Sequence, residues 1–136
     1  MAYREGLYML CSGTDLAGES AYAVLLGPSY EFSDQHTSLS NVSSHEITDE
    51  DYERQAVTGL SVALDGNEIV FNANDVVFGA EVNIAADHFV IVAGDIANPD
   101  PGDELLFYVH LDDMESRNAQ FAIRLPNGIH GITINA

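Results

Sequence analysis

EITDEDYERQAVTGLSVALDGNEIVFNANDVVF, residues 46–78, is the stretch that indicates the fold class most directly. Apolar residues occupy every second position from Leu60 to Leu64, which is the period of a strand with one face on a core and the other in water. The Asp-Gly-Asn sequence at 65–67 tolerates the positive φ of a tight turn. Because the alternation resumes at Ile69, the stretch predicts a β-hairpin.

Further apolar runs predict strands on both sides of this hairpin. They lie at residues 21–26, 75–78, 81–84, 88–93, 104–111, 120–125 and 129–134. The stretch 95–103 is predicted to be a loop, because proline has no N–H for a strand ladder. About eight strands with almost no helix predict an all-β fold, an antiparallel β-sandwich or jelly roll, with a barrel as the alternative. The one helix expected is short and covers residues 2–10 at the N-terminus.

The chain of 136 residues is predicted to form a single β-sandwich domain over residues 1–136. A domain of this length buries roughly two-thirds of the surface that its unfolded chain exposes. Hydrophobic residues make up 46% of the chain, which is too many for a disordered protein.

Charge is the unusual quantity, because 22 Asp and Glu face four Arg and give a formal net charge of −18. Such a surface repels phosphates and anionic lipids, since Lys and Arg supply most of the affinity for nucleic acid. Neither nucleic acid nor a membrane is therefore expected as a partner. The acidity fits solubility or a salt-rich habitat, or alternatively an acidic face offered to a basic partner.

Cysteine usage and hydropathy concern the compartment. Cys11 is the only cysteine, so no intrachain disulfide is expected and a buried thiol is the default. No apolar run approaches the roughly 18 residues that span a bilayer, and the first ten residues lack the apolar core of a signal peptide. A soluble protein made in the cytoplasm is the expectation.

Motifs for metal ions and catalysis are weak. The five histidines form no HxxxH or HxH pair, so a zinc site is not expected. The acidic runs 49–51 and 112–115 fit either solvated turns or weak calcium binding, and turns are favoured. No Gly-x-Ser-x-Gly elbow, P-loop or dinucleotide fingerprint occurs, so neither a cofactor nor an enzyme activity is predicted.

Two surfaces are candidates for assembly. Residues 33–53 form a long polar loop with few apolar anchors, and long loops in compact domains often bind partners. The N-terminal segment around Tyr3 and Tyr8 is the second candidate. The residues predicted to form an assembly interface are Tyr3, Leu7, Tyr8, Leu39, Val42, Ile47 and Tyr52. The six tyrosines also fit a sugar-binding platform, but tryptophan is absent, and packing in a core or subunit interface is the favoured interpretation.

The order of these blocks resembles that of small virion proteins of tailed bacteriophages, encoded among head and tail structural genes. The matching features include an EIT-x-x-x-Tyr motif, a TG-x-x-V strand, an acidic-aromatic turn and a closing Asn-Gly turn. They lie at residues 23–36, 46–62, 72–78, 89–93, 105–113 and 121–134, so nearly the whole chain is covered. Two features depart from the family: Val77 and Phe78 replace the usual Trp, and residues 98–103 are richer in proline.

The resemblance implies a structural role in the virion, as a capsid decoration or cement protein, with a tail or head-to-tail component as the alternative. Its acidity favours the outer capsid surface, away from packaged phosphates. The partner would be the major capsid protein, bridged by a homodimer or homotrimer at a symmetry axis. An alternative of another class is a carbohydrate-binding module for host adhesion. A glycan-degrading enzyme is the third interpretation, and it is not favoured, because no turnover of glycans is expected.

Overall fold

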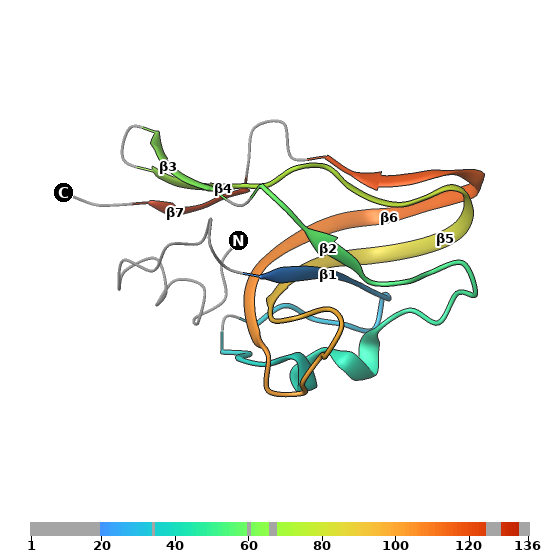
Figure 1. Cartoon of the computed structure of the whole chain (residues 1–136), viewed down its shortest axis with the longest axis horizontal. Helices are drawn as coiled ribbons and strands as arrows, with labels where there is room; N and C mark the ends of the chain where they lie inside the picture. The colour runs from blue at the N-terminus through green and yellow to red at the C-terminus, as the bar shows by residue number, and fades with distance from the viewer. Residues whose placement is uncertain (1–19, 34, 60, 66–67, 125–128, 134–136) are drawn as a thin grey trace.

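The computed structural model describes residues 20–33, 35–59, 61–65, 68–124 and 129–133 (Figure 1). Within them it contains seven strands, two 3₁₀ turns and no α-helix, which confirms the predicted all-β class. The elements are β1 (Ala21–Leu26), η2 (Leu39–Asn41), η3 (Ser43–His45), β2 (Gln55–Val57), β3 (Ser61–Asp65), β4 (Glu68–Asn72), β5 (Val76–Ala93), β6 (Glu104–Ile123) and β7 (Ile129–Thr133). The helix predicted over residues 2–10 and the thiol of Cys11 lie outside the described residues.

The strands form two antiparallel sheets, in the orders β2-β1-β5-β6 and β3-β4-β7. The predicted hairpin is the β3–β4 pair, in which Val62 lies opposite Phe71. The apolar run 21–26 is β1, as predicted. No helix in this described part of the chain is long and apolar enough to cross a membrane.

Strands β5 and β6 are longer than predicted. The three candidates between residues 75 and 93 are one strand of 18 residues, and the turn predicted at 112–115 lies inside β6, a strand of 20 residues. Bulges explain the difference, because an extra residue shifts the alternation of side chains and makes one strand resemble several. Ala86 pairs with Met114 and His88 with His110, so β6 uses four residues where β5 uses two.

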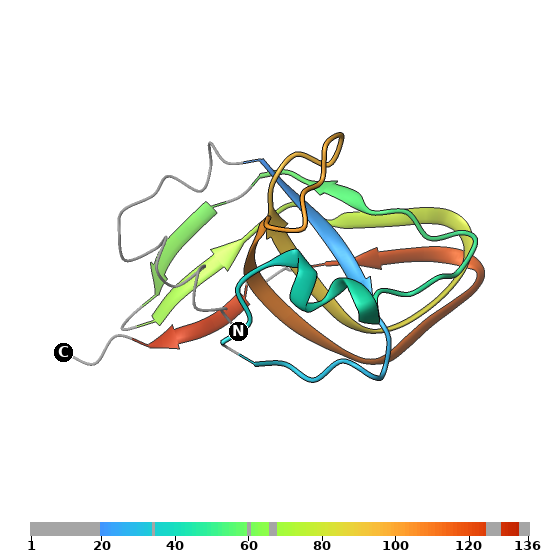
Figure 2. The ribbon, with the colours of Figure 1, turned by 90° about the horizontal axis from the view of Figure 1, so that it is seen from below.

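The β5–β6 hairpin curves back on itself, so that the start of β5 and the end of β6 lie across from the other half of the hairpin (Figures 1 and 2). The first core cluster joins the two halves: it contains Phe78 and Phe121 from one, and Phe89 and Ile91 from the other. The rings of Phe78 and Phe121 meet edge to face, with centroids 5.9 Å apart. The bend therefore encloses an apolar core.

Residues 27–54 are named here the polar segment, and the part of it that contains η2 and η3 covers the other face of the sheet (Figure 2). Leu39 and Val42 of the segment are buried there against Tyr22 and Val24 of β1, in a second core cluster. Because both faces of β1 are covered, all six of its residues are buried. The apolar anchors thus fix the polar segment to the sheet and leave its hydrophilic residues at the surface.

Candidate functional site

Three histidines gather around one tyrosine where the polar segment crosses the sheet, and a fourth histidine lies beside one of them. The ring centroid of Tyr30 lies 5.6 Å from those of His36 and His45, and 5.4 Å from that of His88 on β5. The ring of His110 on β6 lies 5.3 Å from that of His88. These five residues are named the histidine cluster, and they bring four of the chain's five histidines together from three parts of the sequence.

The pairing of β5 with β6 builds the strand half of this cluster, because His88 lies directly opposite His110. The hydroxyl oxygen of Tyr108 lies 2.7 Å from Nδ1 of His88 and 3.4 Å from Nδ1 of His110. Tyr108 in turn stacks on Phe32 of the polar segment, with ring centroids 4.7 Å apart. One phenol oxygen therefore connects two imidazoles across the hairpin.

The buried part of the cluster disfavours charge. His88 is 7% exposed, and burial is the main cause that lowers its pKa from the usual value. The imidazoles of His110 and His45 lower the pKa of His88 further, while a backbone hydrogen bond with Tyr30 opposes them. Burial also raises the pKa of the Tyr108 hydroxyl. His88 and the hydroxyl of Tyr108 are consequently uncharged at neutral pH.

A surface hollow of about 380 Å³ opens beside the cluster within the polar segment. In it, Nδ1 of His36 is 3.0 Å from the hydroxyl of Tyr30, and Nδ1 of His45 is 2.8 Å from that of Ser29. Neither Nε2 atom has a partner among the described residues. The residues lining the hollow are Ser29, Tyr30, Glu31, Phe32, Ser33, His36, Asn41 and His45. The hollow therefore offers polar groups at its walls and a largely buried aromatic ring.

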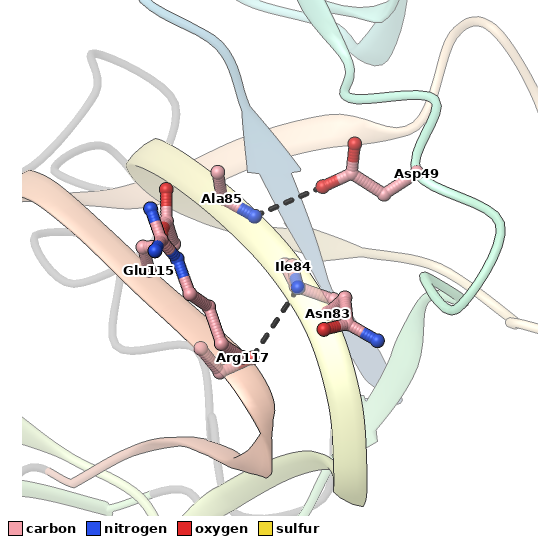
Figure 3. A pocket seen from close by; sticks show the side chains of 7 residues that line it. Asp49, Asn83, Ile84, Ala85, Glu115 and Arg117 are labelled. Carbon is pink, nitrogen blue, oxygen red and sulfur yellow. Dashed lines mark hydrogen bonds and ion pairs between the residues drawn. The ribbon is translucent and has the colours of Figure 1, made fainter.

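A second hollow, of about 410 Å³, lies beside Asp49 and is lined by neighbouring residues of β5 and β6 (Figure 3). Asp49 of the polar segment points at the strand and accepts a hydrogen bond from the backbone N–H of Ala85 at 2.9 Å. Asp51 accepts another from the N–H of Asn83 at 2.8 Å. The N–H of Ile84, between them, points the opposite way, to Ser116 of β6. The two carboxylates thus occupy the place of a neighbouring strand.

A half-buried ion pair holds the same segment at its other side. Arg54 donates to both carboxylate oxygens of Glu46, at 2.9 Å from Nε and 2.7 Å from Nη2. The hydroxyl of Tyr52 donates to Glu46 at 2.5 Å and accepts from the backbone N–H of Leu25 at 3.2 Å. Burial, followed by the hydrogen bond to Glu46, raises the pKa of Tyr52 above its usual range. The network closes the edge of β1 beyond β2.

The structure places four of the predicted interface residues in intramolecular packing. Leu39 and Val42 are buried in the second core cluster, and Ile47 and Tyr52 are half-buried against the first. The other three, Tyr3, Leu7 and Tyr8, lie outside the described residues. Docking through the polar segment stays a prediction, and a partner would meet exposed side chains there, which include Ser40, Asn41, Ser43, Ser44, Thr48 and Glu50.

Metal binding gains no support from the acidic runs. Within the described ranges, no three His, Cys, Asp or Glu side chains are grouped so that they could hold a metal ion. Asp49 and Asp51, which sequence alone left open as weak calcium ligands, instead accept backbone hydrogen bonds from β5. The run 112–115 continues β6.

No family model matches this chain, and comparisons with curated proteins and with solved structures give no match either. The function is therefore argued from the residues of the chain and their arrangement.

Proposed function

We propose that this protein is a structural component of a bacteriophage virion, a capsid decoration or cement protein that binds the outer head surface and bridges major capsid subunits. The observation that carries the proposal is the order of the sequence blocks, which resembles that of small tailed-phage virion proteins from residue 23 to residue 134. The features lie in β1, the polar segment, the β3–β4 hairpin and both long strands.

The charge of the chain supports the outside of the head. A net charge of −18 would face packaged phosphates at close range inside the shell, whereas outside it keeps particles apart. The same charge makes nucleic acid and anionic lipid poor partners. A basic patch on the capsid surface is the complementary target.

The covering of the edge of β5 by two aspartates supports the proposal that the protein is displayed in many copies. A strand edge with unpaired N–H groups invites further strands, and proteins suppress this with charged residues and covering loops. Asp49 and Asp51 do so at Ala85 and Asn83. Neighbouring copies on a crowded lattice would then not pair with one another through the edges of their β5 strands. We further propose that the bent hairpin and the sheet act together as a β-sandwich or jelly-roll body.

The docking surface we propose is the exposed polar side of the polar segment. Its turns are anchored from beneath by Leu39 and Val42, so the serines between and around them are presented on a fixed frame. A homodimer or homotrimer at a local symmetry axis of the lattice would multiply weak contacts of this kind into tight binding.

The test is co-sedimentation of the purified protein with expanded heads that lack it, followed by an averaged cryo-microscopy map. We expect near-stoichiometric binding at regular lattice sites on the outer surface. The double substitution Ser43→Arg and Ser44→Arg should abolish binding. The substitutions Ala80→Arg and Ala119→Arg, at exposed positions of the β5–β6 hairpin, should leave it intact. Absence of the polypeptide from particles would refute the proposal, and density at the neck or tail would favour the tail or head-to-tail alternative.

A carbohydrate-binding module is the second candidate, and one observation favours it. The hollow beside the histidine cluster has a volume in the range of small-molecule sites, and the Nε2 atoms of His36 and His45 have no partner among the described residues. Glycan-array binding by the isolated protein, lost on changing Asn41 to Ala, would support this function over the cement function.

A further inference from the structure

We propose that the histidine cluster is an acid-responsive latch, which holds the polar segment on the sheet at neutral pH and releases it when the cluster takes up protons. The inference goes beyond the proposed function and does not depend on it. Its basis is the position of the cluster, which lies across the boundary between two parts of the structure.

The latch has one half on each side of this boundary. Tyr30, His36 and His45 belong to the polar segment, while His88 and His110 belong to the hairpin. Tyr30 is 3% exposed and is in ring contact with three of the four imidazoles. Charge on His88 therefore lies directly against the ring that fastens the polar segment.

The neighbours of His88 offer no anion to balance a charge. From the polar segment it faces Tyr30 and His45, and from β6 it faces Tyr108 and His110. From β1 it is paired with an apolar leucine, Leu26.

The carboxylate of Glu46, which follows His45, is already bound by Arg54 and Tyr52, and other carboxylates lie at the margin of the cluster. Glu31 lines the hollow with His36 and His45, and Asp87 precedes His88 in β5. None of the four histidines is ion-paired with a carboxylate in the described part of the chain. Protonation thus places positive charges close together without a counterion.

The force that would release the polar segment acts between His88 and the groups of that segment. The ring of His88 lies against Tyr30, and the imidazole of His45 disfavours a proton on His88. Because His45 belongs to the polar segment and His88 to β5, repulsion between them acts across the boundary and favours separation of the segment from the sheet.

The direction of the pH dependence follows from the lowered pKa of His88. The unfolded or released form binds a proton more readily than the latched form, so acid favours release. The latch is at full strength above the ordinary histidine pKa and weakens as the pH falls from there toward the lowered value. Carboxylates titrate about two units lower, so the two effects separate.

Hydrogen exchange tests the latch on the full-length protein, between about pH 7.5 and about pH 5.5, after correction for intrinsic exchange rates. Peptides covering residues 27–46 contain the N–H groups of Gly27, Val42 and His45, which are hydrogen-bonded in the latched form. We expect these peptides to exchange several-fold faster at the lower pH. Peptides of β1 and of the first core cluster should change much less.

Variants assign the effect to the cluster. His88→Phe keeps an aromatic ring but cannot be protonated, and should remove the acceleration. Should His88→Phe fail to fold, His110→Gln at an exposed position removes the neighbouring charge and should reduce it. His130→Gln is the matched control, because His130 lies on β7 in the other sheet, and it should behave as the unsubstituted protein.

Two results would overturn the proposal. One is equal protection of residues 27–46 at both pH values in the unsubstituted protein. The other is acid acceleration that persists undiminished in both His88→Phe and His110→Gln, which would assign it to carboxylates.

Discussion

Asp49 accepts a hydrogen bond from the backbone N–H of Ala85, with 2.9 Å between Oδ2 and the nitrogen and 36 residues between them in sequence. Asp51 and Asn83 repeat the arrangement at 2.8 Å. Outward-facing N–H groups recur every second residue along a strand, and the two aspartates are also two residues apart. Side-chain oxygens therefore imitate the carbonyls of an absent strand.

Changing both aspartates to alanine should destabilise the fold and expose the edge of β5. Each lost hydrogen bond should cost about 1 kcal/mol in the free energy of unfolding, measured by urea denaturation. The unpaired N–H groups should also make the protein associate with increasing concentration, as measured by light scattering. Glu50→Ala, between the two, is the control and should change neither quantity; a monomeric double variant of unaltered stability would contradict the role of Asp49 and Asp51.

Glu46→Gln should cost about 2 kcal/mol, because it leaves the guanidinium of Arg54 half-buried without its charged partner. Arg117→Ala is the comparison. Arg117 is paired with Glu115, but its side chain is 86% exposed, and its removal should change stability by less than about 0.5 kcal/mol. Equal losses from the two substitutions, in chemical denaturation at the same ionic strength, would show that burial of the Glu46 pair is unimportant.

Phe121→Ala should destabilise the protein by about 3–5 kcal/mol, since Phe121 is fully buried and meets Phe78 within the first core cluster. Val77→Ala, on the neighbouring strand and 42% exposed, should cost less than about 1 kcal/mol. Thermal and urea unfolding measure both variants. A small loss at Phe121 would mean that the bent end of the hairpin does not pack as described.

Alkaline pH should unfold the protein through Tyr22 and Tyr52. Burial is the main cause that raises the pKa of both, and hydrogen bonds to Asp103 and Glu46 raise it further. The two hydroxyls therefore lose their protons at a higher pH in the folded form than in the unfolded form. Their contribution to the free energy of unfolding is fully present below about pH 10 and is lost as the pH rises above that value. Tyrosinate absorbance and circular dichroism should change together, and the slope of stability against pH should be shallower in Tyr52→Phe. Ionisation of all six tyrosines near pH 10 without unfolding would contradict this.

The strands that could be predicted are those whose apolar pattern, either continuous or alternating, stays the same along the whole strand. β1 is a compact apolar run between glycines, and β3 and β4 alternate across a turn, so all three were predicted where they lie. β5 and β6 break the alternation at five register shifts, among them that between Ala86 and His88, and each shift imitates a strand end. β2 has three residues, too few to show a period.

The candidate site was not predictable, because it depends on register and not on motif. His88 and His110 are neighbours only through the pairing of the hairpin, and His36 and His45 reach them only because Leu39 and Val42 anchor the polar segment. The acidic run 49–51 was predicted to be a solvated turn or a weak calcium site, and it lies outside the strands. The hydrogen bonds of Asp49 and Asp51 to a strand edge required the position of β5 to be known.

The bent hairpin also has a kinetic consequence. Val76 pairs with Ile123, the last partners to meet if the two strands close outward from the connection between them. Their meeting completes the enclosure of the first core cluster, so we expect a late and slow final step in folding. The reverse step must open the same enclosure before any strand can leave, and the folded protein should accordingly persist for long times once formed.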